Sequence, residues 1–143
     1  MGLDMYLMAS RFLYKSSPEK TAIQKALDFD CADDTVQVRA DVMYWRKANA
    51  IHSWFVDNIQ NGEDECRTYS VSDEDLEDLI TLCDKVLEDP EQAALLLPTA
   101  QGFFFGSMEY DDDYVSDLKY TSEQLKQVLT KFSGWQFEYC SSW

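Results

Sequence analysis

Apolar residues along this chain recur with two different periods, and segments of one period alternate with segments of the other. Residues 3–9 and 36–42 place an apolar side chain at every second position, which is typical of a strand with one buried face. Residues 48–59 and 76–87 place one at every third or fourth position, which is typical of an amphipathic helix. The order of these segments is too irregular for a doubly wound sheet. It predicts an α+β fold with a small, mostly antiparallel or mixed sheet and helices packed on one side.

Local signals predict the element boundaries in the first half of the chain. A serine–proline pair at residues 17–18 favours the start of a short helix, which is expected to bury Ile23, Ala26 and Leu27. The longer helix that follows the second strand is expected to begin near Tyr44, where the period changes. The first half is therefore predicted as strand, helix, strand, helix.

The second half of the chain carries similar signals. Ser72 precedes three acidic residues, which predicts the N-cap of a helix. Residues 103–105 predict a short buried strand, and residues 111–117 predict a loop or a single helical turn. A capping-box pattern at Thr121 predicts the last helix, and alternation over residues 135–139 predicts the last strand.

The chain is predicted to form one domain over residues 1–143, because this length matches the usual size of a single domain. An apolar content of 45%, with 14% aromatic residues, is too high for a disordered chain. Ten residues on the apolar sides of their segments are expected to be buried: Met5, Leu7, Ile51, Phe55, Leu76, Leu79, Ile80, Cys83, Leu125 and Leu129.

Charge is distributed unevenly along the chain, whose net charge is −15. Residues 1–61 hold 8 acidic and 7 basic residues, a net of −1, whereas residues 62–143 hold 19 and 5, a net of −14. Such a field repels nucleic acid and anionic membranes and attracts basic protein surfaces, although an acidic surface can also serve solubility alone. The acidic surface expected to bind a partner comprises Asp73, Glu74, Asp75, Glu77, Asp78, Asp111, Asp112 and Asp113.

The sequence carries no clear signal for a membrane segment, a metal site or a catalytic motif. No apolar run approaches the roughly 18–20 residues that span a bilayer, and the start of the chain lacks a cleavage signature, so we expect a cytoplasmic protein. The four cysteines have no Cys-x-x-Cys spacing and are expected to be small core residues. The acidic runs at 28–34 and 111–113 do not fit an EF-hand loop. The spacing therefore supports no metal, cofactor or catalytic group, and it leaves open whether the chain has an enzymatic activity.

The densest cluster of aromatic and basic side chains lies at residues 44–55, which include two tryptophans and the only histidine. One interpretation is a pocket in which Arg46 and Lys47 hold an anionic or nucleotide-like ligand at a helix start. The other is that the aromatic residues are core, the histidine is hydrogen-bonded at the core edge, and the bases pair with acids. The candidate ligand-binding residues are Tyr44, Trp45, Arg46, Lys47, Asn49, His52, Phe104 and Tyr110.

Four blocks of sequence carry a resemblance to a known family. They are GLDMYL at residues 2–7, YWRKANAIHSWFV at 44–56, LLPTAQGFFFGSMEYD at 96–111 and the terminal SSW at 141–143. In these blocks the chain resembles a family of small acidic proteins of bacteriophages and bacterial genomes to which no activity is assigned. The resemblance implies no catalytic residue. It implies an accessory protein of a phage or prophage that works in the bacterial cytoplasm, a kind of protein that often inhibits host enzymes.

Two functions are therefore expected as alternatives. The first is a non-catalytic acidic protein that binds and modulates or inhibits a basic, nucleic-acid-binding protein of the host or phage, without binding nucleic acid directly. The second is a small-ligand protein or enzyme that uses a pocket around Arg46, Lys47, Asn49 and His52. A convex surface of regularly spaced carboxylates favours the first, whereas a concave pocket that holds the bases favours the second. The oligomeric state is open.

Overall fold

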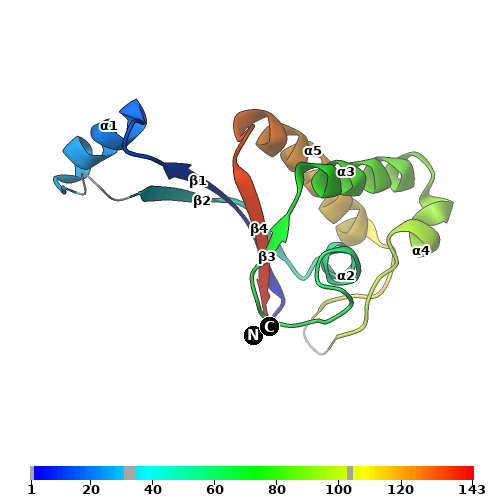
Figure 1. Ribbon diagram of the computed structural model, residues 1–143. Helices are drawn as coiled ribbons and strands as arrows, with labels where there is room; N and C mark the ends of the chain where they lie inside the picture. Colours follow the sequence, from blue (N-terminus) through cyan, green and yellow to red (C-terminus); the bar gives the residue numbers. More distant parts are fainter. Residues whose placement is uncertain (1, 31–34, 103–104) are drawn as a thin grey trace.

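The computed structural model describes residues 2–30, 35–102 and 105–143. Within these residues, four strands form one antiparallel sheet in the order β2-β1-β4-β3 (Figure 1). The strands are β1 (Asp4–Leu13), β2 (Val36–Arg46), β3 (Tyr69–Val71) and β4 (Gln136–Ser142). The α+β class and the antiparallel sheet predicted from the two periods are confirmed.

Helices α2 to α5 cover one face of this sheet (Figure 1). The helical elements are α1 (Pro18–Leu27), α2 (Asn49–Asn58), α3 (Asp73–Glu88), the short 3-10 helix η1 (Pro90–Gln92), α4 (Ala93–Leu96) and α5 (Asp112–Lys131). Helices α3 and α5 pack side by side and run in opposite directions (Figure 1). The end of α5 therefore lies near the start of α3.

The core lies between the sheet and the helices that cover it. Leu3, just before β1, and Met5, Leu7 and Ala9 on β1 are fully buried, as the period of two predicted. Met8 and Ser10, on the other face of β1, are buried as well. Of the ten residues expected to be buried, nine are buried, and Leu129 is partly buried against the core. The apolar faces of the helices were therefore predicted correctly for α2, α3 and the second half of α5.

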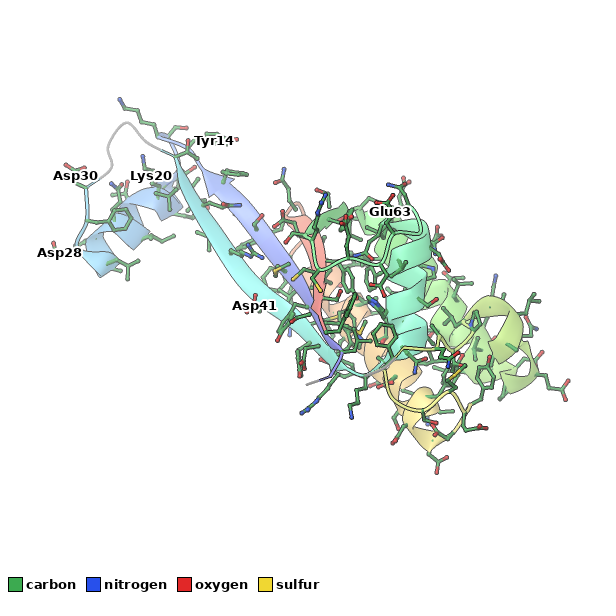
Figure 2. The ribbon with its side chains drawn as sticks, turned by 90° about the horizontal axis from the view of Figure 1, so that it is seen from below. Tyr14, Lys20, Asp28, Asp30, Asp41 and Glu63 are labelled. Atoms are coloured by element: carbon green, nitrogen blue, oxygen red, sulfur yellow. The ribbon has the colours of Figure 1, made fainter. Side chains whose placement is uncertain are left out.

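Beyond Ser10, β1 no longer pairs with β4 and continues with β2 as a two-stranded arm. This arm, with α1 at its tip, projects away from the helices that cover the sheet (Figures 1 and 2). The start of α1 at Pro18 is as predicted, but the prediction that it buries Ile23, Ala26 and Leu27 is wrong. Ala26 and Leu27 are exposed, with Leu27 at 70%, because α1 lies outside the layer that forms the core.

The predicted helix start near Tyr44 is wrong, since β2 continues to Arg46. Met43 and Trp45 pair with Leu7 and Met5 of β1 and are buried, so the strand alternation extends through the aromatic cluster. Lys47 then adopts a positive φ of 59°, which ends the strand, and α2 begins at Asn49.

The predicted capping box at Thr121 is also wrong, because α5 is continuous from Asp112. The Asp111 side chain accepts a hydrogen bond from the Tyr114 amide and provides the N-cap instead. Thr121 lies inside the helix, where its hydroxyl donates to the Asp117 carbonyl and accepts from the Trp45 indole at 2.8 Å. A polar residue thus occupies a buried position of the helix.

Two further predictions concern residues 103–105 and the cysteines. Of the predicted strand at 103–105, Phe103 and Phe104 lie outside the described residues, and Phe105 is buried in a bend rather than a strand. Of the three cysteines that the structure describes, Cys83 is buried, and burial raises the pKa of its thiol to about 12. Cys66 is exposed, so the expectation that the cysteines are core residues fails there.

Candidate functional site

A cavity of about 440 Å³ opens at the N-terminal end of α2. It lies between the β2–α2 junction, the described parts of the segment at 99–109 (residues 99–102 and 105–109, called the 99–109 loop) and the first two turns of α5. This volume is within the range of about 300–1,000 Å³ that is usual for small-ligand sites. Arg46 and Lys47, which the sequence placed in a possible pocket, both line it.

Asn49 builds one wall of the cavity by holding the 99–109 loop. Its side-chain amide donates to the carbonyl oxygens of Phe105 at 3.1 Å and Ser107 at 2.7 Å, and its oxygen accepts from the Ala100 amide at 3.1 Å. Gly106, with φ of 91°, lets this loop approach Lys47, because a Cβ there would lie 3.2 Å from the Lys47 Cβ. Asn49 is thus a positioning residue whose polar atoms are engaged within the protein.

The first turn of α2 contributes the positive end of a helix to the same cavity. Its N-cap is Ala48, which offers no side-chain cap, and the next three residues, Asn49, Ala50 and Ile51, line the cavity. Amide groups of a first helical turn have no partners within the helix and favour negative charge. Arg46 and Lys47 therefore lie beside a helix end of the same sign.

The opposite wall is acidic and comes from the start of α5 and the residues before it. Glu109, Asp111, Asp113 and Asp117 line the cavity there. The pKa of Asp111 is lowered, because its carboxylate accepts a hydrogen bond from the Tyr114 amide. The pKa of Asp117 is raised to about 6, first by partial burial and then by the negative charges of Asp113 and Asp111.

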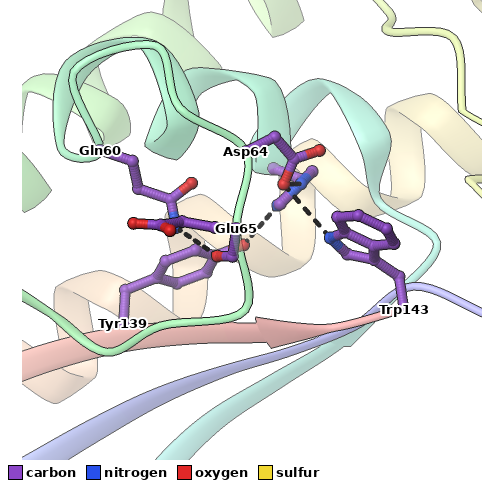
Figure 3. A network of polar contacts seen from close by, with 6 residues as sticks. Gln60, Asp64, Glu65, Tyr139 and Trp143 are labelled. Atoms are coloured by element: carbon purple, nitrogen blue, oxygen red, sulfur yellow. Dashed lines mark hydrogen bonds and ion pairs between the residues drawn. The ribbon is translucent and has the colours of Figure 1, made fainter.

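His52 does not line this cavity and is 1% exposed. Its Nδ1 lies 2.8 Å from the Tyr139 hydroxyl and its Nε2 lies 3.0 Å from Asp64, while the Trp143 indole donates to the same carboxylate (Figure 3). Burial lowers the pKa of His52, although Asp64 opposes this shift. The arrangement matches the interpretation of a hydrogen-bonded histidine at the edge of the core.

The other candidate ligand residues are dispersed. The buried Trp45 is engaged with Thr121, and Tyr44 lies exposed on β2, where its hydroxyl donates to Asp4. Tyr110 is exposed and packs edge-on against Tyr114, with ring centroids 5.0 Å apart. Phe104 lies outside the described residues. The structure thus brings Arg46, Lys47 and Asn49 together and separates the remaining candidates from them.

The acidic candidates fall into two groups at opposite ends of the antiparallel α3–α5 pair. Asp73, Glu74, Glu77 and Asp78 are exposed on the first two turns of α3, and we call these four residues the α3 acidic face. Asp75 is instead part of a capping box with Ser72. Asp111 and Asp113 belong to the cavity wall, and Asp112 is exposed beside them.

Asp117 is, with Glu109, an acidic wall residue that was not among the candidates from the sequence. It lies four residues after Asp113, which places both on one side of α5. Because the sequence predicts a helix that begins only at Thr121, it does not predict that Asp113 and Asp117 share a helical face. The signal was therefore present in the sequence, but it depended on the correct helix start.

Comparisons with known proteins add no relative: no family model, no curated protein and no solved structure matches this chain. Among the residues that the structure describes, no group of three or more histidine, cysteine or acidic side chains is arranged to hold a metal ion. Within the same residues, no helix has the length and apolar character needed to cross a membrane.

Proposed function

We propose that this protein is a non-catalytic interaction protein that binds a basic surface of another protein, of the kind that holds nucleic acid. The α3 acidic face is the contact surface. In the setting that the sequence resemblance implies, the partner is a nucleic-acid-binding protein of a bacterial host or phage, and binding inhibits it by covering its basic surface.

The observation that carries this proposal is that the carboxylates of the α3 acidic face are exposed and unpaired. Within the described residues, α3 takes part in one ion pair, between Asp84 and Lys126 at 2.8 Å. None of the four residues of the α3 acidic face forms an ion pair with another described residue. Asp73 and Glu77 are separated by one helical turn, as are Glu74 and Asp78, so the charges repeat about every 5–6 Å along the helix.

Electrostatic steering explains how such a face would select its partner. Unpaired surface charges of one sign raise the encounter rate with a surface of the opposite sign and repel surfaces of the same sign. This attraction is screened over about 8 Å at physiological ionic strength. Apolar contacts must then supply most of the final affinity, and the attraction by the carboxylates sets specificity and rate.

The proposal is tested by capturing partners from a bacterial lysate on the immobilised protein and eluting them with double-stranded DNA. We expect a basic protein that DNA releases, because both ligands would compete for one basic surface. The triple variant Glu74→Gln, Glu77→Gln and Asp78→Asn should lose this protein. It leaves the Ser72–Asp75 capping box intact, so α3 should keep its start.

A matched control variant carries the same change in net charge at a different place. Asp28→Asn, Asp41→Asn and Asp57→Asn neutralise three exposed carboxylates outside α3. The control should retain the partner as the natural protein does. Equal loss of the partner by both triple variants would show that only total charge matters. A captured protein that DNA does not release would contradict competition for a nucleic-acid site.

A further inference from the structure

We propose that two copies of this chain associate through β2, an edge strand of the sheet. The two β2 strands would pair antiparallel about a twofold axis at Ala40, so that the two sheets form one continuous sheet. The contact lies at the sheet edge opposite β3, the strand that leads into α3. It uses no residue of the α3 acidic face, so the proposal does not rest on the proposed function.

The first step is that β2 is a long strand with one open edge. It has 11 residues and pairs with β1 on one side, whereas β3, at the other edge of the sheet, has 3 residues. Within the described part of the chain, residues 36–46 make no backbone–backbone hydrogen bond outside the ladder with β1. Unpaired backbone groups along an edge are a template for a further strand, and a very short edge strand avoids this. The edge at β2 is therefore the one that can accept another strand.

The second step is that the charges on β2 are complementary to a second copy of β2. Arg39 and Asp41 are exposed, lie two residues apart and therefore share a face of the strand. Figure 2 shows Asp41 beside β2 on the side away from β1. When Ala40 stands opposite Ala40 of the other copy, each Arg39 stands opposite an Asp41. Opposite charges directly across a sheet stabilise the pair of strands, and like charges destabilise it.

The charges also select this register over its neighbours. An axis one residue earlier would set Arg39 against Arg39, and an axis one residue later would set Asp41 against Asp41. The irregularity in the β1–β2 ladder leaves Val42 without a partner in β1, which limits the regular ladder between two copies to residues 38–42. Such a short ladder predicts a reversible dimer.

The third step is that a single chain leaves these side chains poorly satisfied. Neither Arg39 nor Asp41 forms an ion pair with a described residue. The Arg39 guanidinium contacts the Met8 sulfur, which is a weak acceptor. Val38 and Ala40, which alternate with the charged residues, are only half-buried. A second copy of β2 would give each charge an opposite charge and would cover more of these apolar side chains.

The fourth step is that β2 lies where two strongly acidic chains can approach each other. Each chain carries a net charge of −15, and this charge opposes association. Residues 11–46, which include most of β1 and all of β2, hold 6 acidic and 6 basic residues, whereas residues 62–143 carry a net of −14. Contact through β2 therefore joins the neutral segments of the two copies.

Sedimentation equilibrium of the full chain over a range of concentrations tests the association. We expect a reversible dimer of twice the 16.6 kDa mass of one chain. Arg39→Glu and Asp41→Arg each set like charges across the ladder and should each weaken the dimer by at least about tenfold. A mixture of the two variants should form the dimer again, because each cross-strand pair then joins opposite charges. A natural chain that stays monomeric, or a mixture that does not associate, would overturn the proposal.

Controls separate this register from an effect of total charge. Arg46→Glu and Asp57→Arg make the same changes in net charge at exposed positions outside residues 38–42 and should leave the dimer unchanged. If total charge alone governed association, Asp41→Arg would strengthen the dimer, because it makes the chain less negative. Circular dichroism checks that each variant is folded. Equal weakening by the controls, or a stronger dimer of Asp41→Arg, would place the contact elsewhere.

Ala40→Cys gives a second readout that does not depend on charge. In the proposed register, the two introduced thiols face each other across the axis, with Cα atoms about 4.5–5.5 Å apart, which a disulfide can span. Oxidation should therefore link this variant into covalent dimers well above the level of the natural chain. Gln37→Cys is the control, because its two copies would lie about 20 Å apart. Equal cross-linking of both variants would contradict the register.

Discussion

At the residue scale, buried polar side chains join segments that lie far apart in the sequence. Trp45 on β2 donates to Thr121 on α5, Asn49 on α2 holds the 99–109 loop, and His52 on α2 contacts Tyr139 on β4. A buried polar group without a partner costs about 1–3 kcal/mol, so each of these bonds favours one arrangement of the segments it joins. The cavity wall depends directly on Asn49.

His52 should make the stability of the protein depend on pH. Its pKa is lowered in the folded state, mainly by burial, whereas the unfolded chain takes up the proton near pH 6.5. The unfolded state therefore binds more protons as pH falls below about 6.5, and the free energy of unfolding decreases. The largest slope for one histidine is about 1.4 kcal/mol per pH unit. Urea unfolding of the natural protein at a series of pH values measures it.

The control for this prediction is His52→Gln, which keeps hydrogen-bonding atoms but does not titrate. Asp117 contributes with the opposite sign, because its pKa of about 6 in the folded state is raised, and stability from this group is lost as pH rises through that value. This contribution is common to the natural protein and the variant, so it cancels in the comparison. Parallel stability profiles in the two proteins would contradict the role given to His52.

At the element scale, helices and strands whose apolar residues recur without interruption could be predicted, but the residues at which they begin and end often could not. The stripe of α3 and the alternation of β1 are visible because each apolar position is occupied by an apolar residue. In α5, buried Thr121 interrupts the stripe that Tyr114 and Leu118 begin, so the helix was expected to start late. A pattern of apolar residues does not predict the burial of a polar residue whose hydrogen-bond partner comes from a distant segment of the chain.

Only the part of the candidate site that comes from one continuous stretch of sequence could be predicted. Arg46, Lys47 and Asn49 were identified because basic and aromatic residues gather in one stretch of sequence. The acidic wall was not, because it faces α2 only after the chain has passed through β3, α3 and α4. Which distant residues meet across a cavity depends on how the elements pack, and a single sequence contains no local signal for that.

Ser72 tests the start of α3, on which the α3 acidic face depends. Its hydroxyl accepts from the Asp75 amide at 3.1 Å, and Asp75 accepts from the Ser72 amide at 3.0 Å. Ser72→Ala should lower the free energy of unfolding by about 1 kcal/mol, because it removes this cap. Chemical denaturation measures the change, with Ser70→Ala, an exposed serine on β3, as the control. An equal and small effect of both substitutions would show that the cap contributes nothing.

At the scale of the whole molecule, the charge follows the architecture. Residues 11–46, which include the arm and α1, hold 6 acidic and 6 basic residues and are neutral overall. Residues 62–143, which form β3, β4 and the helices α3 to α5, carry the net charge of −14. The arm projects away from this acidic part (Figure 2). A basic partner of the proposed kind would therefore be drawn to the helical side of the molecule rather than to the arm.

The most direct test of the central claim is the association rate of the DNA-released partner with this protein, measured at about 0.1 M and about 1 M salt, where the screening lengths are about 10 Å and 3 Å. If the α3 acidic face steers the encounter, the rate for the natural protein should fall by about tenfold or more at the higher salt. The Glu74→Gln, Glu77→Gln, Asp78→Asn variant should show a much smaller fall, and the control triple variant should behave as the natural protein does. The same salt dependence in both triple variants would contradict the claim that this face binds the partner.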